Sequence, residues 1–184
     1  MVHNMIKDAS DQQIEYLTGQ KHLQKLALEL FRLFNMKNVQ PCIRFFGNLF
    51  AINEALCSEY VKSNGILDLL KRVFTYCTKI TRKEALWLVS NIAANSEEDA
   101  CAIADSALIV NILCACRDSA HEVRKEAVWA LSNIAFKLHD SAHIEKLVDD
   151  DIMSILLEML QKDADSGSIA SLALTTVNEM LVKS

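Results

Sequence analysis

Two copies of one residue pattern carry most of the chemistry that this sequence offers. Each copy has a glutamate, a tryptophan three residues later and an asparagine four residues after that: Glu84, Trp87 and Asn91, then Glu126, Trp129 and Asn133. A primary amide both donates and accepts hydrogen bonds, so it can hold the backbone of an extended peptide whatever its sequence. An indole face attracts a lysine or arginine side chain, and a carboxylate one turn away can pair with its cation. The pattern predicts a site for an extended basic peptide.

The two copies belong to longer segments that repeat. TRKEALWLVSNIAANSEED and VRKEAVWALSNIAFKLHD align without a gap over their first fourteen positions, at an offset of 42 residues. Forty-three residues before Asn91, the segment VQPCIRFFGNLFA keeps the asparagine as Asn48 but has Arg44 in place of the tryptophan. A fourth segment, SLALTTVNEML, has Thr175 and Glu179 at the two positions and is therefore the most diverged copy.

Four units of this length account for almost the whole chain of 184 residues, so we expect a single domain over residues 1–184. The unit boundaries are predicted at about 10–51, 52–94, 95–137 and 138–184.

Within a unit, the pattern of apolar residues predicts a short, a medium and a long helix. In the third unit a capping box at Ser96 to Asp99 opens the short helix, which ends near Asp105, and helices are expected over 107–116 and 122–136. Three helices in 40–47 residues are typical of armadillo repeats, whose stacked units share one core. With only 4 glycines and 1 proline, the turns of an all-β fold are missing. We therefore predict an all-α fold, an armadillo-repeat right-handed superhelical solenoid of about four three-helix repeats.

The long helices have two distinct faces when drawn at 100° per residue. In the third unit the apolar arc consists of Val123, Ala127, Ala130, Leu131 and Ile134. Glu126, Trp129 and Asn133 lie on the other side, so we expect the tryptophans and asparagines to project into a shared concave groove. In the first unit Cys42, Phe45, Phe46 and Leu49 are expected inside, with Arg44 and Asn48 outside. Two alternatives stay open: core packing for the tryptophans, and an inter-repeat hydrogen bond or a helix-end cap for the asparagines.

Composition excludes several other classes of protein. Apolar residues make up 51% of the chain and charged residues 23%, the balance of an ordinary globular protein. The longest uncharged stretch has thirteen residues, too short for a membrane span, and no signal peptide is visible. The six cysteines have no disulfide spacing, so we expect buried free thiols in an intracellular, reducing compartment. The net charge of −5 argues against nucleic acid and suits a basic peptide.

No residue pattern points to catalysis, a cofactor or a metal. His139 and His143 are four residues apart but have no third ligand nearby, and we expect both to lie on a surface connection. There is no glycine-rich phosphate loop, no GxSxG motif and no Cys/His pair at catalytic spacing. The acidic run 149–151 is expected to be a solvated helix start. We therefore expect a protein that is not an enzyme, with no cofactor and no metal.

The segments KEALWLVSNIAA and RKEAVWALSNIAF resemble the armadillo repeats of importin-alpha (karyopherin alpha), the nuclear-import adaptor, over nearly the whole chain. The IRFFGNLFA copy resembles the family repeat in which an arginine separates two peptide sites, and the order of units resembles the carboxy-terminal part of the array. That part holds the family's minor site for nuclear localisation signals. The resemblance implies a ladder of Trp87, Asn91, Trp129 and Asn133 for the signal, with Glu84 and Glu126 on its basic side chains and Arg44 and Asn48 at the border.

The resemblance further implies a nuclear-import adaptor module that binds Lys/Arg-rich localisation signals of cargo proteins, in the cytoplasm and the nucleus, without nucleic acid or membrane. Importin-beta is an implied partner through a basic segment that this sequence does not include, so the chain is either a fragment or a short relative. Where the family usually has a glycine after the asparagine, this sequence has Asn95 and Lys137. Asn95 can end its helix in a left-handed conformation, whereas Lys137 is a poorer stop. The alternative is a non-catalytic armadillo scaffold that binds a folded or helical partner.

Overall fold

The computed structural model describes residue 16 and residues 19–149, 152–162 and 167–183, and every regular element among them is an α-helix. The first two helices are α3 (Lys21–Leu33) and α4 (Met36–Phe50). They are followed by α5 (Glu54–Ser63), α6 (Ile66–Tyr76), α7 (Lys79–Asn95), α8 (Glu97–Asp105), α9 (Leu108–Cys116), α10 (His121–Lys137), α11 (Ser141–Asp149), α12 (Ile152–Lys162) and α13 (Gly167–Lys183).

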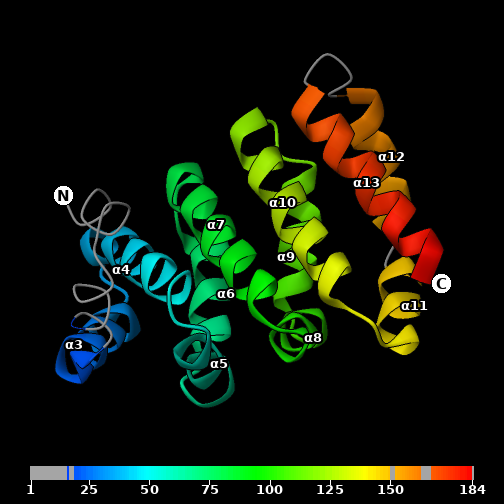
Figure 1. Cartoon of the computed structure of the whole chain (residues 1–184). Coiled ribbons are helices and arrows are strands. Elements are labelled where there is room, and N and C mark those ends of the chain that lie inside the picture. Colours follow the sequence, from blue (N-terminus) through cyan, green and yellow to red (C-terminus); the bar gives the residue numbers. More distant parts are fainter. Residues whose placement is uncertain (1–15, 17–18, 150–151, 163–166, 184) are drawn as a thin grey trace.

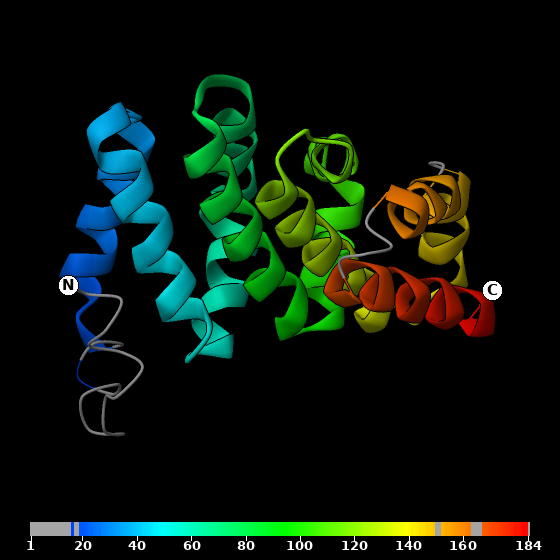
Figure 2. The same ribbon diagram turned by 90° about the horizontal axis from the view of Figure 1, so that it is seen from above.

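The helices repeat as triplets of two shorter elements and a long one: α5 to α7, α8 to α10 and α11 to α13, preceded by α3 and α4. In the third predicted unit the first two helices, α8 and α9, are equally long, with nine residues each. The long helices α4, α7, α10 and α13 pack each against the next and form one layer in front of α6, α9 and α12 (Figure 1). Seen from above, the units follow one another along the array, with α3 and α13 at opposite ends (Figure 2). The all-α armadillo-type solenoid that the sequence predicts is therefore confirmed.

Polar caps fix where the helices begin. The Ser96 side chain accepts a hydrogen bond from the backbone N–H of Asp99 and opens α8, as the capping box predicts. Asn53 and Thr78 cap α5 and α7 in the same way. The three helices predicted in the third unit are found within one residue of their expected ends. The acidic run 149–151 reaches beyond the described residues, and so does the start of the first unit.

The core is a continuous apolar layer that runs through the array. The inward arc predicted for the third unit is confirmed, because Val123, Ala127, Ala130, Leu131 and Ile134 are all buried. Phe45 departs from the expectation for the first unit: its side chain is only partly buried and packs at the edge of the core. Since each unit covers part of its neighbour's apolar surface, the repeats stabilise one another.

Lysines, not glycines, satisfy the carbonyl ends of two long helices. Lys137 Nζ donates to the backbone oxygen of Asn95 at 3.5 Å, at the end of α7. Lys183 Nζ donates to the carbonyls of Ala135 and Phe136, at 3.1 and 2.7 Å, near the end of α10. Neither Asn95 nor Lys137 has a positive φ, so the left-handed helix end considered for Asn95 is not adopted. A cation from the following repeat takes the place of the glycine cap.

The cysteines are all free, but they are not all buried as the sequence predicts. Cys42, Cys57 and Cys116 are buried, two more are partly buried, and Cys114 is exposed. Burial raises the pKa of the thiols of Cys57 and Cys116 to about 12, which keeps both in the unreactive protonated form at neutral pH. Among the described residues, no single helix is long and apolar enough to cross a membrane, and only α8 and α9 together, bent by 86°, reach that length and composition.

His143 links two repeats instead of lying on a connecting loop. It belongs to α11, and its Nε2 lies 3.1 Å from Asp105 Oδ2 at the end of α8. Its Nδ1 lies 2.7 Å from Asp140 Oδ2, and Lys146 pairs with the other oxygen of Asp105 at 2.9 Å. An imidazolium can donate from both nitrogens at once. The hydrogen bond to Asp105, followed by that to Asp140, raises the pKa of His143 above its ordinary 6.5.

This bridge predicts a pH-dependent stability. The contribution of His143 is fully present below its unfolded pKa of 6.5 and is lost as the pH rises through the higher folded pKa. The lowered pKa values of Asp105 and Asp140 contribute stability that is present above their ordinary 3.8 and is lost only as the pH falls below it. We expect the stability difference between wild type and His143→Gln, measured by urea unfolding, to shrink between about pH 6 and pH 9. An equal difference across this range would contradict the bridge.

Candidate functional site

The side chains of Asn91 and Asn133 donate hydrogen bonds to the preceding long helix. Asn91 Nδ2 donates to the backbone oxygen of Gly47 at 3.0 Å, and Asn133 Nδ2 donates to the backbone oxygen and the hydroxyl of Ser90, at 3.0 and 2.9 Å. The inter-repeat hydrogen bond left open at the sequence level is therefore present. No described residue donates to either Oδ1 atom, so each amide keeps its acceptor. The asparagines can accept from a peptide N–H, but their donor capacity is partly used by the fold.

The two tryptophans differ in their surroundings. The six-membered ring of Trp87 lies over the backbone of Gly47, where an added Cβ would come within 2.2 Å of Cζ3. Trp87 is accordingly half-buried, whereas Trp129 is 43% exposed. Exposure of an apolar indole ring to water is unfavourable, and the open ring face can bind a cation or the aliphatic part of a lysine or arginine side chain. Trp129 is the aromatic group of this face that is most available to a ligand.

The two glutamates also differ, because one of them is already paired. Arg44 donates to Glu84 at 2.6 Å, and this hydrogen bond and the attraction of the carboxylate raise the pKa of Arg44. Glu126 is half-buried and forms no ion pair with any described residue. Burial raises the pKa of Glu126 above its ordinary 4.5 despite the opposing effect of Lys83 and Lys125. A cation brought by a ligand would stabilise the charged form of Glu126.

The sequence predicts that Asn48 lies outside, but this prediction is wrong, because Asn48 is buried and only 7% exposed. The reason is that α4 is flanked by α3, α5 and α7. Its Nδ2 is buried without a hydrogen-bond partner among the described residues. Asn48 is therefore a poor candidate for direct contact with a ligand.

The fourth copy cannot extend the ladder. The exposed hydroxyl of Thr175 bonds back to the Ser171 carbonyl of its own helix at 2.8 Å. Glu179, at the asparagine position, pairs with Lys183 at 2.9 Å. The ladder is thus confined to α7 and α10, with Arg44 on α4 at one side. We name the surface formed by Glu84, Trp87, Asn91, Glu126, Trp129 and Asn133 the ladder face.

Sequence reasoning missed the small residue that precedes each asparagine. Gly47 provides room for an indole, and Ser90 accepts the bonds of Asn133. Ser132, at the same position of the third copy, shares a 2.6 Å hydrogen bond with Thr176 of α13. The signal was available in the sequence, because glycine or serine stands directly before the asparagine in all three copies. These small residues allow the long helices to approach closely.

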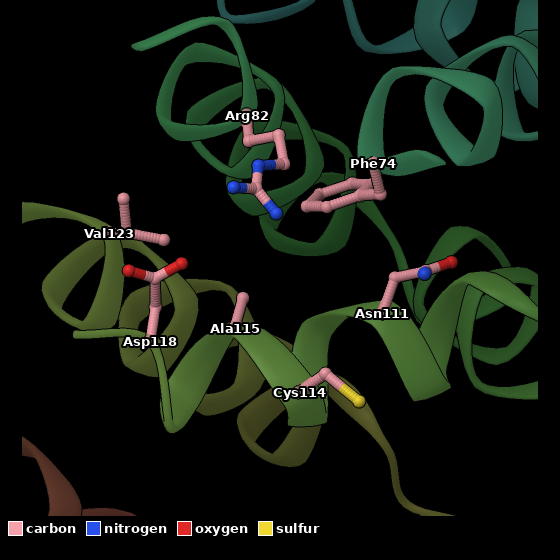
Figure 3. Close-up of a pocket in the computed structure, with 7 residues that line it drawn as sticks. All are labelled: Phe74, Arg82, Asn111, Cys114, Ala115, Asp118 and Val123. Carbon is pink, nitrogen blue, oxygen red and sulfur yellow. The ribbon is translucent and has the colours of Figure 1, made fainter. Parts of the chain in front are cut away.

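A separate small cavity lies between α6, α7, α9 and α10 (Figure 3). It has a volume of about 90 Å³, and its lining consists of Phe74, Arg82, Asn111, Cys114, Ala115, Asp118 and Val123. Arg82 points into it, and its Nε is buried without a hydrogen-bond partner among the described residues (Figure 3). The space suits a few water molecules, which would complete the hydrogen bonds of the guanidinium. We assign no ligand to this cavity.

Comparisons with known proteins define the class of fold. The HEAT-like repeat family model matches residues 80–134. A designed armadillo repeat protein in complex with the peptide (KR)4 is 22% identical, with a TM-score of 0.75 over 96% of this chain and 80% of that chain. Computationally designed armadillo repeat proteins for modular peptide recognition give a TM-score of 0.81 at 18% identity, over 97% of this chain and 72% of that chain. No curated protein sequence matches significantly.

These findings establish an armadillo/HEAT-type helical solenoid. They concern the fold alone, because the identities are low. The assignment to importin-alpha in particular stays a prediction from the two Trp/Asn segments.

Proposed function

We propose that this chain is a non-enzymatic adaptor whose ladder face binds extended Lys/Arg-rich peptides. The observation that carries the proposal is the combination around Trp129, an exposed indole beside the unpaired, half-buried carboxylate of Glu126. Asn133, one turn further along α10, keeps a free acceptor for a peptide N–H. The designed protein solved with (KR)4 has the same fold, which supports a basic peptide as the ligand.

The pairing of Arg44 limits where the peptide can bind. Arg44 occupies Glu84, so the chain's own cation fills the position between α4 and α7 that a ligand would otherwise use. Between α7 and α10, Glu126 has no such partner among the described residues. The peptide's main basic side chain should therefore lie at α10, between the two indoles, with its stem against Trp129.

The finer proposal, that the peptides are nuclear localisation signals, rests on the resemblance of the Trp/Asn segments to importin-alpha. It implies action in the cytoplasm and the nucleus, and importin-beta as a partner through a segment beyond this sequence. Binding of localisation-signal peptides in preference to scrambled basic peptides of equal charge would support this assignment.

The decisive experiment is a titration of labelled (Lys-Arg)4 peptide followed by fluorescence anisotropy. We expect Trp129→Ala to weaken binding at least about tenfold while the melting temperature stays unchanged, because the indole is not in the core. Glu126→Gln should also weaken binding. The matched control is Leu157→Ala, at an apolar residue on α12 that is 51% exposed. Equal affinities for wild type and Trp129→Ala would refute the proposal.

One observation favours a second candidate, a scaffold for a folded or helical partner. The Asn91 amide and the Trp87 ring both contact Gly47, so these residues contribute to stacking of the repeats. If their role were stacking alone, Trp87→Ala would lower the melting temperature and leave the affinity for the basic peptide unchanged. The adaptor proposal expects Trp87→Ala to reduce both.

A further inference from the structure

The turns α3–α4 and α6–α7 lie next to each other on one edge of the array (Figures 1 and 2). On α7, Ile80 of this edge lies one turn before Glu84, where the ladder face begins. Large apolar side chains are gathered there, and four of them are exposed: Leu33 by 75%, Met36 by 55%, Tyr76 by 67% and Ile80 by 67%. Together with Phe34, we name them the apolar edge. A contiguous group of exposed apolar side chains usually marks an interaction surface.

Contacts between the two turns hold the apolar edge in one arrangement. The Phe34 and Tyr76 rings meet edge to face with centroids 6.3 Å apart, and the Arg72 guanidinium lies 4.1 Å above the Phe34 ring. The sulfur atoms of Cys77 and Met36 are 3.8 Å apart. Phe34 has a φ of 54°, the left-handed region that a bulky residue rarely adopts. Phe34 is the left-handed residue that ends α3, and its N–H donates to the Phe31 carbonyl at 3.0 Å.

The repeat itself does not require apolar residues at these turns. At the offset of 42 residues that aligns the second and third units, Tyr76 corresponds to Asp118 and Ile80 to Glu122. The α9–α10 turn thus has carboxylates where the α6–α7 turn has exposed apolar side chains, although both turns join the same kinds of helix. The exposed apolar side chains are therefore specific to the α3–α4 and α6–α7 turns, and the repeat architecture does not explain them.

The charge around the apolar edge indicates what covers it. The segments 30–53 and 69–83 contain eight lysines and arginines and no aspartate or glutamate, in a chain whose net charge is −5. Lys37 and Lys71 are exposed and form no ion pair with any described residue. Lys79 is paired with Asp118 at 3.5 Å. An apolar surface bordered by free cations complements a partner that combines apolar and acidic side chains.

We propose that the apolar edge is a docking surface for an acidic amphipathic segment of a partner protein. Its bulky apolar side chains would cover Leu33, Tyr76 and Ile80, and its carboxylates would pair with Lys37 and Lys71. A protein is favoured over an anionic membrane because membrane recognition typically uses four to eight clustered cations, and here two are free. The negative net charge of the chain also opposes adsorption to an anionic bilayer. The apolar edge adjoins the ladder face at Ile80, one turn before Glu84, whereas the proposed main peptide contacts, Glu126 and Trp129, lie on α10 in the next repeat.

The test uses a labelled synthetic helix-forming peptide with leucine at every third or fourth position and glutamate elsewhere, and a twin peptide with lysine in place of glutamate. We expect the glutamate peptide to bind the whole chain at least about tenfold more tightly than its twin, and less tightly at high salt. The double variant Tyr76→Asp, Ile80→Glu, which copies the polar third turn, should lose at least about tenfold in affinity. Lys37→Glu with Lys71→Glu should give a similar loss.

The double variant Val110→Asp, Leu157→Glu serves as the control, because it adds the same two negative charges at exposed apolar residues on α9 and α12. Affinity for (Lys-Arg)4 should not fall in the Tyr76→Asp, Ile80→Glu variant, because the added carboxylates repel acidic peptides and not basic ones. Equal binding of both peptides, or no effect of the double variant, overturns the proposal. Binding to phosphatidylserine vesicles without binding to the glutamate peptide would overturn it in favour of a membrane, and a dimer lost in the double variant would overturn it in favour of a second copy.

Discussion

Gly47→Ala is expected to lower the free energy of unfolding by about 2 kcal/mol and to displace the indole of Trp87. The new Cβ would lie 2.2 Å from Cζ3 and 2.7 Å from Cη2, far inside van der Waals contact. Overpacking of this kind costs about 3 kcal/mol at its upper range, and the better helix propensity of alanine returns about 1 kcal/mol. Urea unfolding measures the stability, and Trp87 fluorescence in a Trp129→Phe background reports the displacement.

Two controls make this prediction specific. Gly167→Ala, at the start of α13, meets nothing within 4 Å and should cause no loss of stability. Combining Gly47→Ala with Trp87→Leu should cost less than the sum of the two single changes, because the smaller side chain no longer collides with the added methyl group. Strict additivity of the two changes would show that Trp87 does not lie over Gly47. Displacement of the indole should also weaken binding of (Lys-Arg)4.

Asp99→Ala is expected to lower the free energy of unfolding by about 2 kcal/mol. Asp99 is fully buried in the first turn of α8, where its carboxylate accepts from the Ser58 hydroxyl of α5 at 2.7 Å and from the Asn95 amide at the end of α7. One side chain thus joins the second repeat to the third. Its removal leaves the Ser58 hydroxyl without this acceptor, a loss that costs about 1–3 kcal/mol, whereas the Asn95 amide keeps the Glu54 carbonyl and Ser58 Oγ as acceptors. Chemical unfolding followed by circular dichroism gives the value.

The neighbouring carboxylate provides the comparison. Glu98 is exposed and pairs with Lys62 at the surface, so Glu98→Ala should leave stability unchanged within error. Asp99→Asn keeps one carbonyl acceptor and should cost less than Asp99→Ala. If Asp99→Ala and Glu98→Ala had equal effects, the inter-repeat role of Asp99 would be wrong.

The fold was predictable from the sequence because the repeat states the same information several times. Two gap-free copies at an offset of 42 residues fix the period, and the apolar arc of Val123, Ala127 and Leu131 fixes which side of the long helix is buried. The capping box at Ser96 marks a helix start through hydrogen bonds that are local in the chain. Such features depend on neighbours within a few residues, so they can be read without tertiary structure.

The candidate site was predictable only in its composition. The sequence places Trp87 and Trp129 at equivalent positions, but the small residue of the preceding long helix is Gly47 in one case and Ser90 in the other. Glycine in one repeat lets the Trp87 ring lie on the backbone, while Trp129 remains 43% exposed. Glu84 and Glu126 are equivalent in the same sense, yet only Glu84 has an arginine within reach.

The sequence by itself therefore determined the all-helical repeat, the faces of the long helices and the types of residue on the ladder face. Only the tertiary structure decided that Asn48 is buried, that Asn91 and Asn133 bond the preceding helix, and that His143 bridges two repeats. The physical reason is distance along the chain. Periodicity and capping act within one helix, whereas burial and pairing on a solenoid depend on side chains from the adjacent repeat, whose identities vary from one unit to the next.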